Sequence, residues 1–258
     1  MERKHIVYVA KADLPYTAAG IRMDGIMRFL ESLGYSFTVV CDREFDKATK
    51  DQAEKLKAKI VSQTSQRVEI SYQNRLYVYK ALKKGNKLQT LFNLLELRFA
   101  KGLFSIVKKY CIQTKASAII LYNDTYALTK QVLRFATRKG IKLFADVTEW
   151  YEQKSRSASI GERMFPKLVD KRIRTLDKRL NGIISISPYL HEYYTSIGAK
   201  SLFIPPLMPE FYLQPQGEGI STIVYAGSPG EKDLLMPAVQ AICKINSENN
   251  HKNSNYIL

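Results

Sequence analysis

Residues suited to bind a metal ion or to form a disulfide are few in this chain. It contains 3 cysteines and 3 histidines in 258 residues. Cys41, Cys111 and Cys243 show no paired spacing, and no histidine lies within a few residues of any of them. An odd, scattered set of cysteines indicates neither a disulfide framework nor a zinc site, so we expect a reducing cytoplasmic location and no metal.

Long apolar runs are also absent. The N-terminal run 6–10 is short, and charged residues lie on both sides of it, which argues against a signal peptide. No later segment approaches the ~18 consecutive apolar residues that a transmembrane helix requires. Any contact with a membrane is therefore expected at its surface.

Acidic residues are scarce relative to basic ones. Lys and Arg number 40 and Asp and Glu 24, which gives a formal net charge of +16. Such a charge favours nucleic acid, an anionic membrane surface or phosphate-bearing substrates as partners, without distinguishing among them. The sequence contains no RNA- or DNA-binding motif and no grouped aromatics, so we expect no nucleic-acid partner.

Short apolar runs alternate with stretches of helical period, which predicts a doubly wound, mostly parallel α/β sheet. Residues 43–87 break this rhythm with a charged, helix-like segment and a polar, tyrosine-rich stretch. The predicted strands are 6–10, 37–41, 118–122, 142–146, 182–187 and 201–204. The predicted helices are 21–33, 88–111, 127–138, 164–179 and 188–196.

Proline and glycine gather between 205 and 219, and the strand and helix rhythm restarts at Ser221. We predict a Rossmann-like N-terminal domain over 1–204, a linker over 205–220 and a second Rossmann-like domain over 221–258. Roughly 30 residues follow the strand predicted at 221–226, too few to bury a core, so we expect this second domain to be incomplete.

The loop after the first strand places Gly20 at the start of the next helix. A glycine there lets a ligand approach the backbone, and the free amides of a helix start favour phosphate. The alternative is a turn glycine with no ligand. The surrounding pattern is not GxGxxG, so it gives poor support to a nicotinamide site.

The segment DVTEWYE, 146–152, follows a predicted strand at the sheet edge where α/β proteins bind ligands. Asp146 and Glu149 are candidate catalytic residues, because a carboxylate can accept a hydrogen bond from a sugar hydroxyl or take its proton. Trp150 is a candidate acceptor-binding residue, because its ring offers an apolar face to a sugar. The alternative is helix capping by Asp146 with Trp150 packed in the core.

A basic stretch covers 80–111 and mixes lysines with Leu, Phe and Ile at helical spacing. Such a stretch can lie in the headgroup region of an anionic bilayer, with Lys83, Lys84, Lys108 and Lys109 near the lipid phosphates. The alternative is a helix that buries its apolar side chains and leaves a solvated basic face. The whole chain therefore has a second interpretation. It would be a non-catalytic basic Rossmann-like domain that binds an anionic membrane surface.

The order of motifs from 183 onward resembles the GT-B glycosyltransferases of family 4, the large retaining group. The motifs are IISISPYL at 183–190, GA at 198–199, IPP at 204–206, YAG at 225–227 and KD at 232–233. The segment DVTEWY is similar to a variant found among members that synthesise polysaccharides. The resemblance covers essentially the whole chain and implies a GT-B-like fold.

The resemblance also implies an activity. A sugar would pass, with retention, from a nucleotide-sugar donor to a polysaccharide or lipid-linked acceptor in cell-envelope or capsule biosynthesis. The nucleotide sugar is a substrate, so no metal or other cofactor is implied. The family's E-x7-E signature would lie beyond Leu258, so we expect the 258-residue chain alone to be an inactive fragment. The implied location is the cytoplasm, with peripheral contact at the inner face of the plasma membrane.

Three positions carry the implied donor contacts. Gly20 matches the glycine that faces the donor phosphates, and Lys232 matches the lysine that neutralises the diphosphate leaving group. Ser228 is the third position expected to contact the donor diphosphate, and many members have an arginine there. Many members also have a histidine near the end of the strand predicted here at 142–146, where this chain has Thr148, Glu149 and Trp150.

Overall fold

The computed structural model describes residues 4–11, 14–81, 94–151, 158–206 and 235–249. The chain forms two units, Met1–Pro209 and Glu210–Leu258, and the boundary between them falls inside the linker predicted over 205–220. In the second unit the structure describes helix α8 (Leu235–Asn249). The strand predicted at 221–226 lies outside the described residues.

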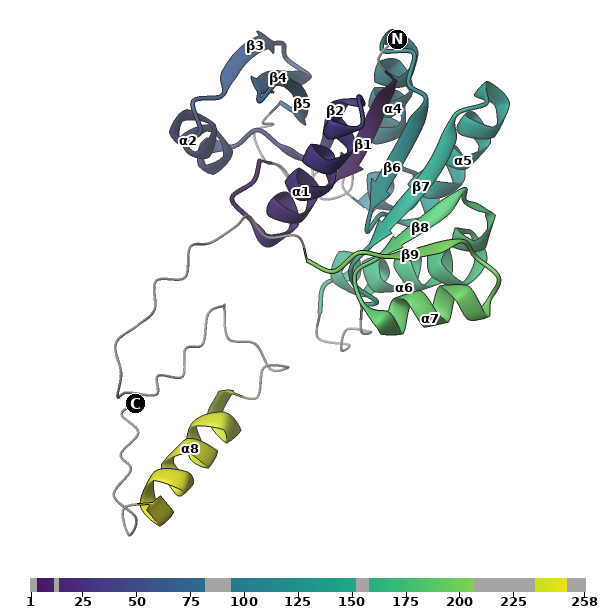
Figure 1. Ribbon diagram of the computed structural model, residues 1–258. Coiled ribbons are helices and arrows are strands. Elements are labelled where there is room, and N and C mark those ends of the chain that lie inside the picture. Colours follow the sequence, from purple (N-terminus) through teal and green to yellow (C-terminus); the bar gives the residue numbers. More distant parts are fainter. Residues whose placement is uncertain (1–3, 12–13, 82–93, 152–157, 207–234, 250–258) are drawn as a thin grey trace. The chain divides into compact units, whose positions relative to one another are not determined.

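The first unit contains a nine-stranded sheet that is mostly parallel (Figure 1). In the part of the sheet that runs through β5, β2, β1, β6, β7, β8 and β9, each strand pairs in parallel with its neighbour. The pairs β3–β4 and β4–β5 are antiparallel. The predicted α/β class is therefore confirmed. In spatial order the strands are β3 (Lys59–Gln63), β4 (Arg67–Tyr72), β5 (Arg75–Lys80), β2 (Ser36–Glu44), β1 (His5–Ala10), β6 (Ala118–Tyr122), β7 (Lys142–Val147), β8 (Gly182–Ser185) and β9 (Ser201–Phe203).

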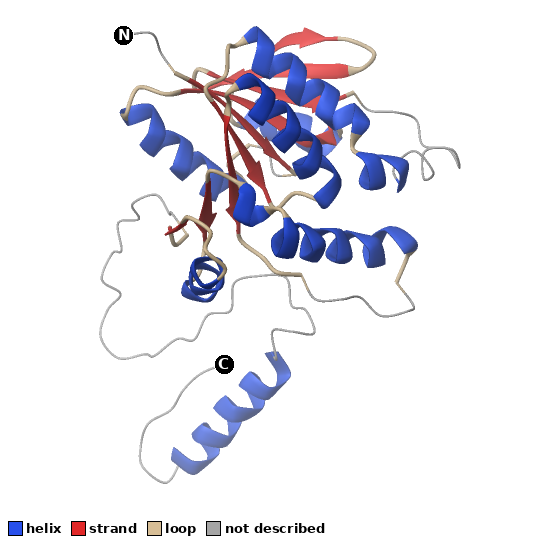
Figure 2. Cartoon of the chain, turned by 90° about the vertical axis from the view of Figure 1, so that its right-hand side faces the viewer, coloured by secondary structure: helices blue, strands red, loops and turns tan. Residues whose placement is uncertain are grey.

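Helices cover both faces of this sheet (Figure 2). Side chains alternate along each strand, so Val7 and Val9 of β1 join a core cluster with α4, α5 and α6, while Ile6 and Tyr8 join a second cluster with α1. The helices of this unit are α1 (Ala18–Ser32), α2 (Lys47–Lys55), α4 (Lys101–Gln113), α5 (Tyr126–Lys139), α6 (Ile160–Thr175) and α7 (Pro188–Ser196), and a 3-10 turn spans Asp177–Arg179.

Local sequence signals fix several helix ends. Ser159 and Glu162 form a capping box at the start of α6, and Ser187 caps α7 with Pro188 at the first helical position. Helix α5 ends at Gly140, whose φ of 68° lies in the left-handed region that glycine tolerates. Within the described ranges, no helix is long and apolar enough to cross a bilayer.

The single helix predicted over 88–111 is wrong, because the chain breaks at Ala100. Residues 94–99 are helical, Ala100 has a φ of 50°, and α4 begins at Lys101. The carboxylate of Glu96 accepts hydrogen bonds from the amides of Gly102 (3.0 Å) and Leu103 (2.7 Å). This side chain therefore satisfies first-turn amides of α4, which stabilises a new helix start.

Residues 43–87, which break the rhythm in the sequence, contain α2 and the three strands β3, β4 and β5. Two residues with positive φ, Gln73 (50°) and Asn74 (60°), form the turn between β4 and β5. Arg75, at the start of β5, is buried and lies 2.5 Å from Asp24 and 2.6 Å from Glu31 of α1. Arg75 is thus part of the interior, although a charged residue is ordinarily expected at the surface.

Candidate functional site

The carboxyl ends of β1, β6 and β7 lie side by side at one edge of the sheet. From β1 the chain proceeds through α1 to β2 on one side, whereas β6 occupies the other side. Ligands of open α/β sheets bind at such a point, where the direction of strand order reverses. The loops at this edge contain Lys11, residues 123–125 and residues 148–151.

Asp146, at the end of β7, forms a buried ion pair with Arg22 of α1. Arg22 Nη2 lies 2.8 Å from Asp146 Oδ1, and the Tyr8 hydroxyl donates a hydrogen bond of 2.7 Å to Oδ2. The Asp146 side chain is 0% exposed. Burial raises the pKa of Asp146, while Arg22 and the Tyr8 hydroxyl act in the opposite direction.

This geometry favours a positioning role for Asp146 over the catalytic role expected from the sequence. Both carboxylate oxygens already accept hydrogen bonds from protein groups, and neither is open to a substrate. Asp146 instead joins β7 to α1 and to β1. The alternative expected from the sequence, helix capping, does not describe it either, since α6 begins at Ile160 and its N-cap is Ser159.

The same Arg22 also binds the chain where it leaves β9. Its Nη1 donates to the carbonyl oxygens of Ile204 (3.0 Å) and Pro205 (3.1 Å). A single buried guanidinium therefore fixes both the end of β7 and the first residues of the predicted linker.

The loops after β6 and β7 are joined by hydrogen bonds. The Thr148 amide donates to Asn123 Oδ1 at 2.9 Å, and the Asn123 side-chain amide donates to the Thr148 hydroxyl. The Thr148 hydroxyl in turn donates to the Tyr122 hydroxyl at 3.2 Å. Polar groups from two strands are thus held together at this edge.

Asp124, one residue further along the β6 loop, is buried and carries a shifted pKa. Burial and then the Asp42 carboxylate raise the pKa of Asp124 from 3.8 to about 7, although the Thr125 amide, Arg172 and Lys11 act in the opposite direction. The Thr125 amide donates to Asp124 Oδ1 at 2.6 Å. A carboxyl group with a pKa near neutrality can hold or release a proton under physiological conditions.

A second buried charged group supports this loop from α6. Arg172 Nη1 donates to the Asp124 carbonyl oxygen at 2.8 Å, and Arg172 Nε lies 3.2 Å from Asp177 Oδ1. The Tyr194 hydroxyl donates to Asp177 Oδ2 at 2.6 Å. The backbone at Asp124 is therefore positioned by contacts from α6, the 3-10 turn and α7.

Glu149 is the exposed carboxylate of this edge. It follows the hydrogen-bonded Thr148, and burial together with the Glu149 carboxylate raises the pKa of the Tyr151 hydroxyl well above its ordinary value. The Tyr151 ring packs edge-to-face against Phe165 of α6 at 5.2 Å. A ligand at the edge can thus reach Glu149 beside an ordered aromatic side chain.

Trp150, predicted as an acceptor contact, is half-buried and engaged with neighbouring helices. Its Nε1 donates to Asp170 at 3.0 Å, the Tyr193 ring lies 4.6 Å from it edge-to-face, and the Arg174 guanidinium lies 5.0 Å from its ring. These contacts favour the packing alternative, since they occupy the indole N–H and much of its surface.

Gly20 lies inside the first turn of α1 rather than before it. Its amide donates to the hydroxyl of the N-cap residue Thr17 at 3.0 Å, so this particular amide serves the helix cap. Of the remaining predicted positions, Lys108 is exposed and Lys109 half-buried on α4. Lys83, Lys84, Ser228 and Lys232 lie outside the described residues.

The residues of this edge that were not predicted from the sequence are Lys11, Asn123 and Asp124. All three directly follow strands, and the polar run 123–125 after an apolar strand is the same signal that identified 146–149. Across the described part of the chain, no three His, Cys, Asp or Glu side chains gather into a group that could hold a metal ion.

Solved structures that are similar to this chain include the following two. A crystal structure of Arabidopsis thaliana UGT89C1 complexed with UDP-L-rhamnose matches 95% of it at 11% identity with a TM-score of 0.49. One of Glycyrrhiza uralensis UGT73P12 complexed with glycyrrhetinic acid 3-O-monoglucuronide matches 79% at 12% identity with a TM-score of 0.38. The chain spans 63% of the length of the first and 49% of the second.

No protein-family model matches the chain. No curated protein matches its sequence. The function therefore has to be argued from the site itself.

Proposed function

We propose that this sheet edge is the acceptor side of a glycosyltransferase that uses a nucleotide-sugar donor. The observation that carries the proposal is the pair of carboxyl groups on adjoining loops, the exposed Glu149 and the buried Asp124 with a pKa of about 7. Asn123 and Thr148 hold these loops together. Carboxylates and amides at such an edge suit the recognition of sugar hydroxyls.

In the proposed reaction, Glu149 accepts a hydrogen bond from the acceptor hydroxyl and takes its proton, while the oxygen attacks the anomeric carbon from the same face that the donor phosphate leaves, so that the configuration is retained. A new glycosidic C–O bond forms, the bond to the donor phosphate breaks, and the nucleoside diphosphate leaves. Lys11 is exposed at the same sheet edge and supplies a cation near the developing negative charge. Asp146 and Arg22 act as positioning residues.

The finer parts of the proposal rest on the motif resemblance. They are membership of family 4 with a GT-B fold, retention of configuration and a polysaccharide or lipid-linked acceptor of the cell envelope. We further propose that Lys232 and Ser228 contact the donor diphosphate from the second unit. The resemblance implies a further donor contact at the first turn of α1, around Gly20. No metal or other cofactor takes part in the proposed reaction.

We also propose peripheral contact with an anionic membrane surface. The observation that favours it is the composition of α4 and α5, which together carry seven Lys or Arg residues and no Asp or Glu. Such a surface attracts anionic lipids through many weak interactions. Membrane contact and sugar transfer can coexist, since the residues assigned to each lie on different elements of the first unit.

Acceptor binding tests the main proposal with the chain as it exists. Oligosaccharides and a short-chain prenyl-diphosphate-linked saccharide would be titrated into the purified protein and followed by calorimetry and NMR. We expect saturable binding that shifts the resonances of Tyr122, Thr148 and Tyr151. Glu149→Gln should weaken it at least about tenfold, which corresponds to the loss of a charge-assisted hydrogen bond.

Glu192→Gln, which removes an exposed carboxylate on α7, is the matched control and should leave binding unchanged. Binding that is equal in Glu149→Gln and in the wild type would contradict the assigned site. Absence of binding to every saccharide tested would contradict the proposed acceptor function.

A further inference from the structure

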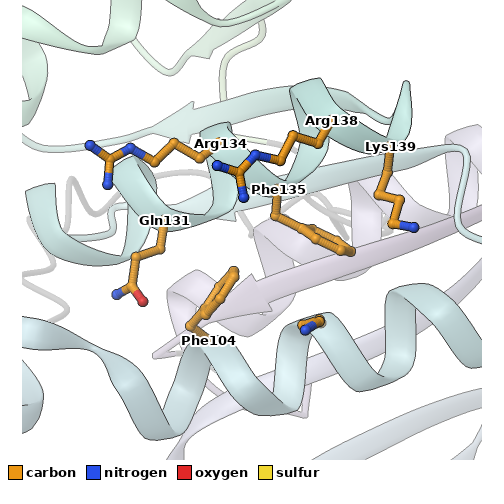
Figure 3. A pocket seen from close by; sticks show the side chains of 7 residues that line it. Phe104, Gln131, Arg134, Phe135, Arg138 and Lys139 are labelled. Carbon is orange, nitrogen blue, oxygen red and sulfur yellow. The ribbon is translucent and has the colours of Figure 1, made fainter.

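A hollow of about 360 Å³ lies between α4 and α5, away from the sheet edge described above (Figure 3). Figure 3 shows Phe104 of α4 and Phe135 of α5 pointing toward each other across it, with Arg134 and Arg138 along its α5 side. The lining residues are Phe104, Lys108, Gln131, Arg134, Phe135, Arg138 and Lys139.

The charge around this hollow has one sign. Four of its lining residues are cations, and all four are exposed. Neither helix contains an acidic residue, and none of these cations forms an ion pair with another described residue. The hollow therefore has an uncompensated positive potential that attracts anions.

Its floor is apolar. The rings of Phe104 and Phe135 pack edge-to-face at 6.1 Å, and Phe135 is buried against the core. Ile112 follows Phe104 and Lys108 in steps of four along α4, so it lies on the same row of the helix, and it is 55% exposed. This exposed apolar side chain at the end of a basic hollow suits a ligand with both charged and apolar parts.

We infer that this hollow binds the phosphate headgroup of an anionic phospholipid, with Lys108, Arg134 and Arg138 near the phosphate and Ile112 at the acyl boundary. The inference rests on the proposed membrane contact and assigns it to a place on the molecule. The membrane contact expected from the sequence was confined to 80–111, and the inference extends it to α5.

Two features favour a lipid over other anions. The cations are spread along two helices at the rim, an arrangement that suits an extended anionic surface better than a single small ion. The two aromatic rings pack edge-to-face against each other and Phe135 is buried, so they do not form the row of exposed stacking platforms that single-stranded nucleic acid requires. The shared chemistry of these ligands is the phosphate, so the experiment has to separate them.

The position of the hollow also leaves the candidate acceptor edge free. Helix α5 begins beside residues 123–125 at the carboxyl edge and ends at Gly140, before β7 starts at the opposite edge. Arg138 and Lys139 are its last residues and lie toward that opposite edge. A protein docked through them does not cover Glu149 with lipid.

The test is sedimentation with vesicles of phosphatidylcholine, either pure or containing 30 mol% phosphatidylglycerol. We expect binding to the anionic vesicles alone, lost in 0.5 M salt. Arg134→Glu/Arg138→Glu should reduce the partition coefficient at least about tenfold, because each surface cation contributes on the order of a fivefold factor. Ile112→Ser should reduce it severalfold without a change of charge.

Lys47→Glu/Lys55→Glu is the matched control, since it reverses two exposed lysines on α2. Circular dichroism and thermal unfolding would confirm that all variants fold. If the control lowers binding as much as the hollow variant does, the inference is overturned and general membrane contact remains. Absence of binding to anionic vesicles overturns both, but leaves the acceptor proposal standing.

Glycerol 1-phosphate and a 20-nucleotide single-stranded DNA are the soluble probes. Neither should bind with an affinity that the Arg134→Glu/Arg138→Glu variant reduces. If either probe binds in the hollow while anionic vesicles do not, the lipid assignment is overturned in favour of that anion.

Discussion

Replacing Asp124 by asparagine should stabilise the protein in a strongly pH-dependent way. Burial and the Asp42 carboxylate raise the pKa of Asp124 from 3.8 to about 7. Between these values the native protein holds a proton that the unfolded chain has released, so the contribution of this group to stability falls as pH rises. It falls by about 1.4 kcal/mol per pH unit, and by roughly 4 kcal/mol over the whole window.

Asparagine has nearly the same shape and keeps the oxygen that accepts the hydrogen bond of the Thr125 amide, but it never ionises. The free energy of unfolding of Asp124→Asn should equal that of the wild type at pH 4. The difference should then grow in favour of the variant and level off above pH 7, at an upper bound of about 4 kcal/mol.

Urea unfolding at unit steps from pH 4 to pH 8 measures this difference. Subtracting the wild-type curve removes the titration of all other groups. Asp51→Asn, an exposed position on α2, is the control and should give a small and flat difference. If Asp124→Asn is less stable than the wild type at pH 8, Asp124 is needed there as an anion, and a pKa near 7 for its carboxyl group is wrong.

Two further predictions concern stability. Asp146→Asn should lower the free energy of unfolding by roughly 3–5 kcal/mol in urea titrations, because it leaves Arg22 charged and buried without its carboxylate. Arg28→Met removes an ion pair whose arginine is 61% exposed and should cost less than about 1 kcal/mol, so equal losses would contradict the buried-pair argument. Lys115→Gly should raise the melting temperature, since exposed Lys115 has a φ of 50° after α4 and a glycine there saves about 1 kcal/mol of strain. Lys109→Gly, which removes a lysine within the same helix, should lower it by a similar amount.

The parallel half of the sheet could be predicted because its signals are local. The strand Ala118–Tyr122 and the helix Pro188–Ser196 have the bounds that the sequence indicates, since each combines an apolar pattern with clear start and stop residues. The β4–β5 hairpin was missed because its turn, Gln73 and Asn74, contains no glycine. The ion pairs of Arg75 with α1 depend on distant residues that no local pattern reveals.

The break at Ala100 escaped prediction for a related reason. The residue at the break is alanine rather than proline or glycine, and the apolar period continues across it. The new helix start depends on Glu96, which reaches the amides of Gly102 and Leu103 only once the chain has turned. A contact of this kind depends on the folded backbone, so the sequence alone gives little indication of it.

At the candidate site, residue type was a poor guide to role because role depends on burial. Asp146 lies at the end of β7 and Glu149 three residues further on, yet the first is enclosed by Arg22 and Tyr8 while the second is exposed. Since β7 alternates its side chains between the two faces, Asp146 points to the α1 side, where a buried cation meets it. That cation also binds the carbonyls of Ile204 and Pro205, so Asp146 affects where the chain enters the segment toward the second unit. A change at Asp146 should therefore disturb the chain after β9 as well as the end of β7, although Asp146 itself is enclosed and touches no ligand.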